Sequence, residues 1–97
     1  MRRKEPIRIG EALDELFKSM PTIARKIAEA KIPDRWPLLV GSVIASYTTR
    51  MEVKNGRLFV YISSSVARNE VFMRRAVLKE EINRLSGLEV ISTIIVK

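Results

Sequence analysis

Residues 49–64 read TRMEVKNGRLFVYISS, and this stretch decides the fold. On both sides of Asn55-Gly56, apolar and polar residues alternate with a period of two, which is the spacing of a β-strand with one buried face. Asparagine and glycine both tolerate the positive φ angles that a tight type I′ turn requires. The stretch therefore predicts a β-hairpin with a two-residue turn.

A two-residue turn also fixes which residues of the two strands lie opposite each other. Counting outward from the turn pairs Lys54 with Arg57, and alternate pairs then share a face. The face predicted to be buried carries Val53 with Leu58, Met51 with Val60, and Thr49 with Ile62. The opposite face carries Glu52 with Phe59, and Arg50 with Tyr61. That second face therefore presents two aromatic rings among charged side chains.

Three helices are predicted before the hairpin. Apolar residues recur at helical spacing in residues 10–20 and 23–28, and the second of these helices is expected to stop before Pro33. Asp34 is the candidate N-cap of the third helix, with Pro37 in the first turn, where an amide has no intrahelical partner. Gly41 inside this helix implies the close approach of another backbone. The predicted core stripe of the third helix is Trp36, Leu39, Val40, Val43, Ile44 and Tyr47.

One long helix and a final strand are predicted after the hairpin. Ser63, Ser64 and Ser65 supply capping hydroxyls at the start of the helix, and Gly87 suits its C-terminal end. Residues 90–96 are almost all β-branched, which favours a strand. The buried line of the helix is predicted to be Ala67, Val71, Leu78, Ile82 and Leu85. The sequence thus predicts an α+β, two-layer domain with a three-stranded sheet and helices on one face.

Composition narrows the classes of function. A chain of 97 residues suffices for one core, so we expect a single domain over residues 9–97 after a flexible basic segment, residues 1–8. Cysteine and histidine are absent, which excludes disulfides, Cys/His zinc sites and thiol nucleophiles. No set of residues resembles a catalytic centre. We therefore expect a protein that is not an enzyme and needs no metal or cofactor.

The charge balance favours a polyanionic partner. The chain has 18 Lys+Arg against 11 Asp+Glu, a formal net charge of +7. Such a charge attracts nucleic acid, acidic proteins and anionic lipid, and it also serves plain solubility. Because no apolar run is long enough for a signal peptide or a membrane span, we expect a cytoplasmic protein whose partner is not a membrane.

The predicted long helix gathers a basic stripe with one aromatic residue. Projection at 100° per residue places Arg68, Phe72, Arg75 and Lys79 on one shoulder of the buried line, and we name these four residues the helix stripe. Its cations could follow a phosphate backbone while Phe72 stacks on an unpaired base. Equally, Phe72 could pack at the edge of the core and the cations could simply be solvated.

A second candidate site is the polar face of the hairpin, with Arg50, Lys54, Phe59 and Tyr61. Exposed aromatic side chains on a sheet stack bases in some RNA-binding folds. A purely structural role for these residues is favoured over base stacking. A cation–π contact between Arg50 and Tyr61, or burial under the N-terminal helices, would explain the same residues.

Several short motifs follow one another along the second two-thirds of the chain. They are Trp36 before Val40-Gly41, then Asn55-Gly56-Arg57-Leu58-Phe59-Val60, then Ser63-Ser64 with Arg68-Asn69-Glu70, and Ile82-Asn83 before the β-branched end. In this order they resemble the DciA-like family, over about residues 33–97. The resemblance is closest to the short, single-domain members.

The resemblance implies a KH-like fold, binding to single-stranded or structured nucleic acid, and association with the bacterial replicative helicase to assist its loading. The Gly-x-x-Gly loop of many KH domains is absent, so a KH-like site must do without it. The leading hypothesis is a nucleic-acid-binding accessory protein of DNA replication, with single-stranded DNA or RNA as ligand. The alternatives are a protein-interaction module with only nonspecific nucleic-acid contact, and an RNA-binding KH-like protein.

Overall fold

The computed structural model describes residues 21–97, and the structural statements below concern this part of the chain. The helix predicted over residues 10–20 lies outside it. The elements in chain order are α2 (Pro21–Val40), α3 (Ser42–Tyr47), β1 (Thr48–Lys54), β2 (Arg57–Ile62), α4 (Ser65–Met73), α5 (Arg75–Ser86) and β3 (Thr93–Val96). No helix among these is long and apolar enough to cross a membrane.

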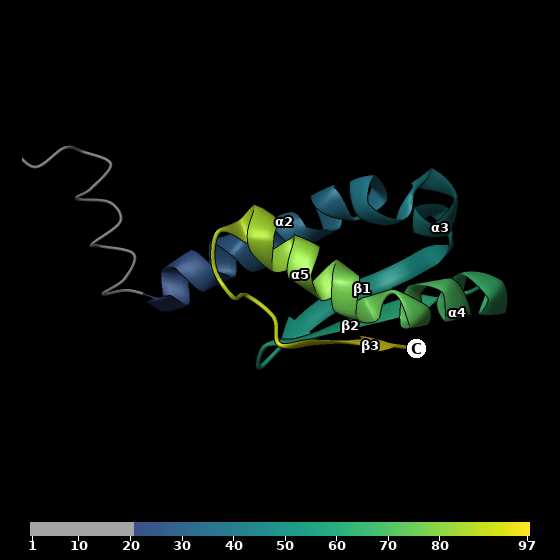
Figure 1. The fold of residues 1–97 in the computed structure, drawn as a ribbon. Coiled ribbons are helices and arrows are strands. Elements are labelled where there is room, and N and C mark those ends of the chain that lie inside the picture. Colours follow the sequence, from purple (N-terminus) through teal and green to yellow (C-terminus); the bar gives the residue numbers. More distant parts are fainter. Residues whose placement is uncertain (1–20) are drawn as a thin grey trace, which may run out of the picture.

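The three strands form one mixed sheet in the order β1-β2-β3. β1 is antiparallel to β2, whereas β3 is parallel to β2. A parallel neighbour needs a crossover connection, which α4 and α5 supply. Helices α2 and α5 lie on the same side of the sheet (Figure 1). The predicted α+β class, the three-stranded sheet and the packing of helices on it are confirmed.

The hairpin turn is confirmed at Asn55 and Gly56, whose φ angles are 53° and 77°. Its register also agrees with the prediction from the turn as far as the pair of Arg50 and Tyr61. One predicted pair is wrong, because Ile62 lies opposite Thr48 and not opposite Thr49. The register shifts between Thr48 and Arg50, as at a β-bulge, where one strand has an extra residue without an opposite partner.

The core lies between the sheet and the helices. β2 is its centre, because every second residue of this strand is almost fully buried. Each of the helices α2, α4 and α5 contributes a buried line, and the segment before β3 adds two residues. The buried apolar side chains are Ala28, Ile32, Trp36, Val40, Leu58, Val60, Ile62, Ala67, Val71, Leu78, Ile82, Val90, Ile91 and Ile94.

Helix α2 differs most from the sequence prediction. It runs without a break from Pro21 to Val40 and contains both Pro33 and Pro37. The predicted end before Pro33 and the predicted N-cap at Asp34 are therefore wrong. Both prolines are exposed, so the buried face of the helix continues past them on the opposite side. Packing of that face outweighs the local preference of proline to end a helix.

The chain breaks instead at Gly41, where φ is 93°. No other atom would lie within 4 Å of a side chain at this position, so the predicted close approach of another backbone is wrong. Because the helix axis is interrupted there, the predicted core stripe continues into α3 only at Ile44, which packs against the core. Val43 is 69% exposed and Tyr47 is 44% exposed.

The predicted long helix is divided at Arg74, whose φ of −103° and ψ of 9° interrupt the helical backbone between α4 and α5. Its predicted start is confirmed, because the side chain of Ser64 accepts a hydrogen bond from the backbone N–H of Ala67 at 3.2 Å. The predicted buried line is confirmed except for Leu85, which is 39% exposed. The predicted final strand begins only at Thr93.

Gly87 ends α5 in the left-handed conformation, with φ at 75°. A Cβ atom there would meet nothing within 4 Å, so only the strain of this backbone conformation opposes a side chain. We expect Gly87→Ala to lower the free energy of unfolding by about 1 kcal/mol, measured by urea denaturation. Gly87→Asn should recover part of this loss, since asparagine tolerates the left-handed region better. Equal stability of Gly87→Ala and the parent protein would contradict this account.

Candidate nucleic-acid interface

The helix stripe spans the break between α4 and α5. Arg68 and Phe72 belong to α4, and Arg75 and Lys79 belong to α5. The break does not separate the two halves, because the Arg75 guanidinium carbon lies 4.0 Å from the centroid of the Phe72 ring. Arg75 Nη1 also donates a hydrogen bond to the Phe72 carbonyl oxygen at 2.8 Å. The structure thus brings the central two residues of the stripe together as a stacked pair.

This stacked pair is accessible. Phe72 is 49% exposed, so its ring is not sealed in the core. Within residues 21–97, Arg75 forms no salt bridge. A guanidinium has five N–H donors, and one of them is used by the Phe72 carbonyl, which leaves the others for an anion.

The outer members of the stripe have protein partners. The Nε of Arg68 lies 3.4 Å from the carbonyl oxygen of Ile62, and this contact ties α4 to the end of β2. The Nζ of Lys79 lies 3.3 Å from a carboxylate oxygen of Glu80. The projection of the helix stripe did not include Glu80, so the Lys79–Glu80 ion pair was not predicted. Ion pairs at the surface are worth little, so an incoming phosphate can compete with Glu80.

Other arginines of the helical layer have structural roles. Arg25 donates to the carbonyl oxygen of Glu89 at 2.9 Å, and Arg74 donates to that of Leu39 at 3.1 Å. Arg84 lies 2.6 Å from Glu81. The hydrogen bond that Arg84 donates to the Glu81 carboxylate and the charge of Arg84 lower the pKa of this carboxyl.

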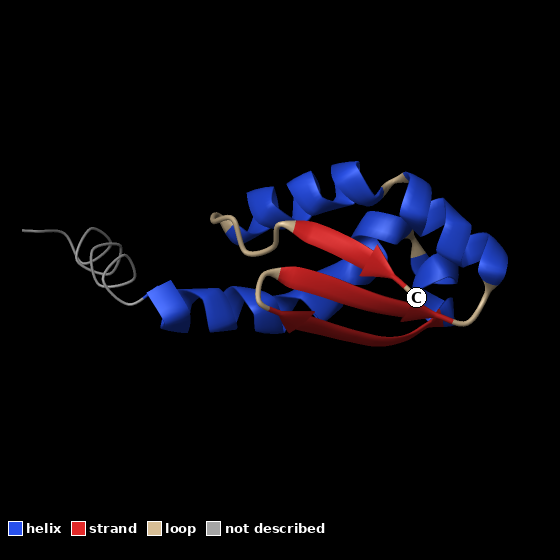
Figure 2. Cartoon of the chain, turned by 90° about the horizontal axis from the view of Figure 1, so that it is seen from below, coloured by secondary structure: helices blue, strands red, loops and turns tan. Residues whose placement is uncertain are grey.

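The outer face of the sheet carries the second predicted set of residues. Phe59 and Tyr61 alternate with the buried Leu58 and Val60 along the central strand, so both rings lie on the outer face. The three strands lie in front of the helices in Figure 2, and no described element covers them on this side. Helix α2 packs on the opposite face, so it does not bury these rings.

Three residues of this face contact one another. The guanidinium of Arg50 lies 5.3 Å from the centroid of the Tyr61 ring, which confirms the predicted cation–π contact. Arg50 also lies 3.3 Å from the carboxylate of Glu52. The Tyr61 hydroxyl donates to the same carboxylate at 3.5 Å. Glu52 therefore neutralises Arg50 and not Lys54.

Two residues of this face were not among the candidate site residues predicted from the sequence. Strand β3 places Ile95 opposite Phe59, and Arg57 lies on β2 two residues before Phe59. The position of Arg57 follows from its pairing with Lys54 in the hairpin. The position of Ile95 follows from the pairing of β2 with β3, for which a single sequence carries no local signal. We use the name outer sheet face for the set Arg50, Glu52, Lys54, Arg57, Phe59, Tyr61 and Ile95.

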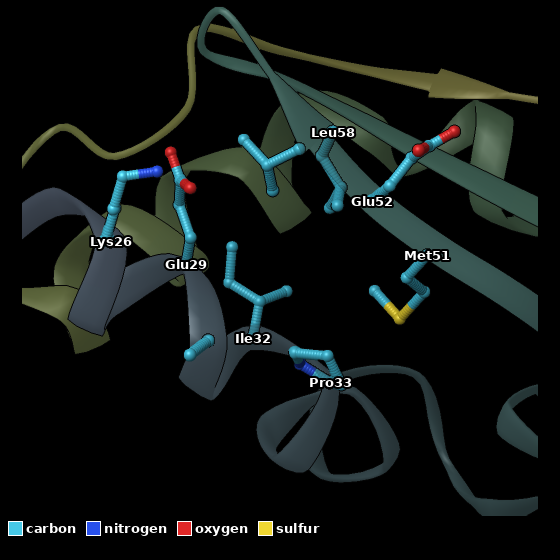
Figure 3. Close-up of a pocket in the computed structure, with 9 residues that line it drawn as sticks. Lys26, Glu29, Ile32, Pro33, Met51, Glu52 and Leu58 are labelled. Atoms are coloured by element: carbon cyan, nitrogen blue, oxygen red, sulfur yellow. The ribbon is translucent and has the colours of Figure 1, made fainter.

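A groove of about 320 Å³ lies between α2 and β1 (Figure 3). Its side chains are mainly apolar, and Lys26 and Glu29 lie together at one end. Charges of both signs at the rim do not favour a polyanion. The labelled lining residues are Lys26, Glu29, Ile32, Pro33, Met51, Glu52 and Leu58.

A model of the family described as "Dna[CI] antecedent, DciA" matches residues 8–96. The chain belongs to the DciA family. Members of the DciA family are accessory proteins associated with loading of the replicative helicase in DNA replication, and they are not a known class of enzyme. The resemblance inferred from the motifs is therefore confirmed. Neither the curated proteins nor the solved structures contain a significant match to the chain.

Proposed function

We propose that this DciA-family chain is a cytoplasmic accessory protein of bacterial DNA replication that binds single-stranded nucleic acid and associates with the replicative helicase. The observation that carries the nucleic-acid part is the exposed stack of Arg75 on Phe72. An arginine held on an aromatic ring is already ordered before a phosphate arrives, so less side-chain entropy is lost on binding.

The helix stripe supplies both contacts that a single strand offers. Arg75 binds a phosphate with its free N–H groups, and the open part of the Phe72 ring contacts an unpaired base. Arg68 and Lys79 lie one helical turn before and after this pair, in α4 and α5, and extend the positive charge in both directions. The contacts are to phosphates and to ring faces, so binding carries little sequence preference.

Salt titration tests the stripe. Binding of a fluorescent oligothymidylate is measured by anisotropy, and the logarithm of affinity should fall with the logarithm of salt concentration by about 0.7 per phosphate contacted. Arg68→Ala, Arg75→Ala and Lys79→Ala together remove three cations. We expect this triple variant to bind more weakly and its salt slope to be shallower by about 2.

The matched control removes three cations elsewhere. Lys26→Ala, Lys31→Ala and Arg35→Ala on α2 change the net charge equally and leave the stripe intact. This control should keep most of the salt slope. An unchanged slope in the stripe variant, with folding intact by circular dichroism, removes the stripe from the site. Equal losses in both variants would show that net charge alone attracts the strand.

A protein-interaction module is the second candidate, and exposed apolar side chains support it. Val66 and Met73 lie on one face of α4 and are 78% and 71% exposed, and Val77 of α5 is 63% exposed. Apolar patches of this kind mark binding surfaces for proteins. A pull-down of the helicase from nuclease-treated lysate tests this function. Recovery of the helicase that is lost in Met73→Lys but kept in the stripe variant would favour it.

Competition between DNA and RNA oligomers tests the RNA-binding alternative.

A further inference from the structure

We propose that the outer sheet face is a second surface for single-stranded nucleic acid, separate from the helix stripe, on which unpaired bases stack. The inference rests on the proposed function only in that the chain must bind nucleic acid at all. The inferred site is formed by β1, β2 and β3. It requires a ligand whose base faces are open.

The apolar centre of this face has the form of a stacking platform. Phe59 and Tyr61 are two residues apart on the central strand, so their positions are separated by roughly 6.6 Å along the strand. Both side chains are half-buried and therefore keep part of their surface open. Ile95 of β3 continues the apolar area beside Phe59. Two rings and one aliphatic side chain offer room for two successive bases.

The cations at the turn end of the same face are not explained by the fold. Lys54 and Arg57 lie directly opposite each other in the register, and both are exposed. Like charges in this position destabilise a hairpin. No salt bridge within the described residues involves either of them. A phosphate bound between the two would convert this repulsion into two favourable contacts.

The charge and the shape of the face decide which ligand fits. Three cations and one carboxylate, Glu52, surround the rings, and Glu52 is already engaged by Arg50 and Tyr61. This excess of positive charge favours a polyanion. An acidic peptide has the charge but not the flat rings, and a duplex hides its base faces in the stack. A single strand has both features, so it is the occupant that we infer.

The test separates base stacking from phosphate attraction. Affinities are measured by anisotropy for an oligothymidylate and for an abasic strand of the same length. The parent protein should prefer the strand with bases by about tenfold. Phe59→Leu with Tyr61→Leu keeps apolar bulk but removes the rings, so the part of this preference that does not come from Phe72 of the helix stripe should disappear. Arg68→Ala with Lys79→Ala on the helix stripe should weaken both strands equally and keep the preference.

A second variant tests the outer sheet face if the leucine substitutions prevent folding. Lys54→Ala with Arg57→Ala changes two exposed residues next to the turn. We expect the midpoint of thermal unfolding to rise, because the repulsion is removed, while the salt slope of binding becomes shallower by about 1.4. A purely structural role for this pair would lower stability and leave the slope unchanged, which would overturn the inference.

Three further outcomes show whether the outer sheet face alone fails as a site or whether the proposed function fails with it. If the leucine variant keeps the parent preference for bases while the stripe triple variant loses affinity, the outer sheet face is not a site and the proposed function stands. If the parent protein binds neither strand, both proposals fail. If polyglutamate of equal length displaces the oligothymidylate as well as an unlabelled strand does, the occupant is an acidic chain and the inference is overturned.

Discussion

Replacing Trp36 with alanine is expected to lower the free energy of unfolding by about 3–5 kcal/mol. The indole is 2% exposed and belongs to the buried face of α2. Its Nε1 donates a hydrogen bond to the hydroxyl of Thr48 at 3.0 Å, and Thr48 is the first residue of β1. The substitution therefore leaves a cavity and also removes a polar link between the helical layer and the sheet.

Urea denaturation followed by circular dichroism measures this loss, since Trp36 is the only tryptophan of the chain and its fluorescence disappears with it. Trp36→Phe keeps an aromatic ring in the core and should cost less than the alanine variant. Leu38→Ala is the matched control on the same helix, because Leu38 is 83% exposed, and it should change stability by less than about 0.5 kcal/mol. Similar losses at Trp36 and Leu38 would refute the assignment of Trp36 to the core.

The hairpin could be predicted because its information is local. Asn55 and Gly56 are adjacent, their conformational preferences are strong, and counting from them fixes the pairs as far as Arg50 and Tyr61. The prediction failed at the far end, where the register shifts and Thr48 takes the place of Thr49. The hydroxyl of Thr48 accepts a hydrogen bond from Trp36, which is distant in the chain. A count of alternating residues could not reveal this contact.

The helices were predicted less well because tertiary packing overrides local signals there. Proline ends most helices, yet α2 continues through Pro33 and Pro37 with its buried face on the other side. Conversely, nothing in the sequence around Arg74 indicates a break, and the side chain of this residue instead bonds to the distant carbonyl of Leu39. Such contacts between segments far apart in the chain decide where these helices begin and end.

The candidate sites were predictable to different degrees. The helix stripe follows from helical spacing, and the break at Arg74 left Arg75 stacked on Phe72. The contact of Lys79 with Glu80 was missed, because adjacent residues point in different directions on an ideal helix and only long side chains bridge them. The outer sheet face was largely predictable, since the hairpin register supplies six of its seven residues whereas Ile95 requires the parallel pairing of β3.

Asn83→Ala is expected to lower the free energy of unfolding by about 3 kcal/mol, because this side chain holds the segment between α5 and β3. Asn83 Oδ1 accepts hydrogen bonds from the backbone N–H groups of Val90 and Ile91 at 2.9 and 3.1 Å. Its Nδ2 donates to the Ile91 carbonyl oxygen at 2.9 Å. Val90 and Ile91 are 0% and 1% exposed, so water cannot easily replace these bonds. The Val90 N–H keeps a second hydrogen bond, to the Leu88 carbonyl oxygen at 2.9 Å. The Ile91 N–H and carbonyl group are left without a partner, which costs about 1–3 kcal/mol each.

The same variant tests how β3 is held against the rest of the sheet. Asn83→Asp keeps the acceptor for both N–H groups and loses only the donor, so it should destabilise the protein less than alanine does. Asn69→Ala is the control, because Asn69 is exposed and, within residues 21–97, its side chain forms one hydrogen bond, from the amide nitrogen to the sulfur of Met73 at 3.5 Å. Hydrogen exchange gives a second measure, since local opening of the segment should speed exchange at Val90 and Ile91 before global unfolding does.

If β3 opens with this segment, Ile95 leaves its place beside Phe59. Asn83→Ala should then weaken the preference for strands with bases at temperatures where the protein is still folded, while binding of the abasic strand stays unchanged. Loss of stability without faster exchange at Val90 and Ile91 would mean that Asn83 acts through the core as a whole, and that β3 does not depend on it.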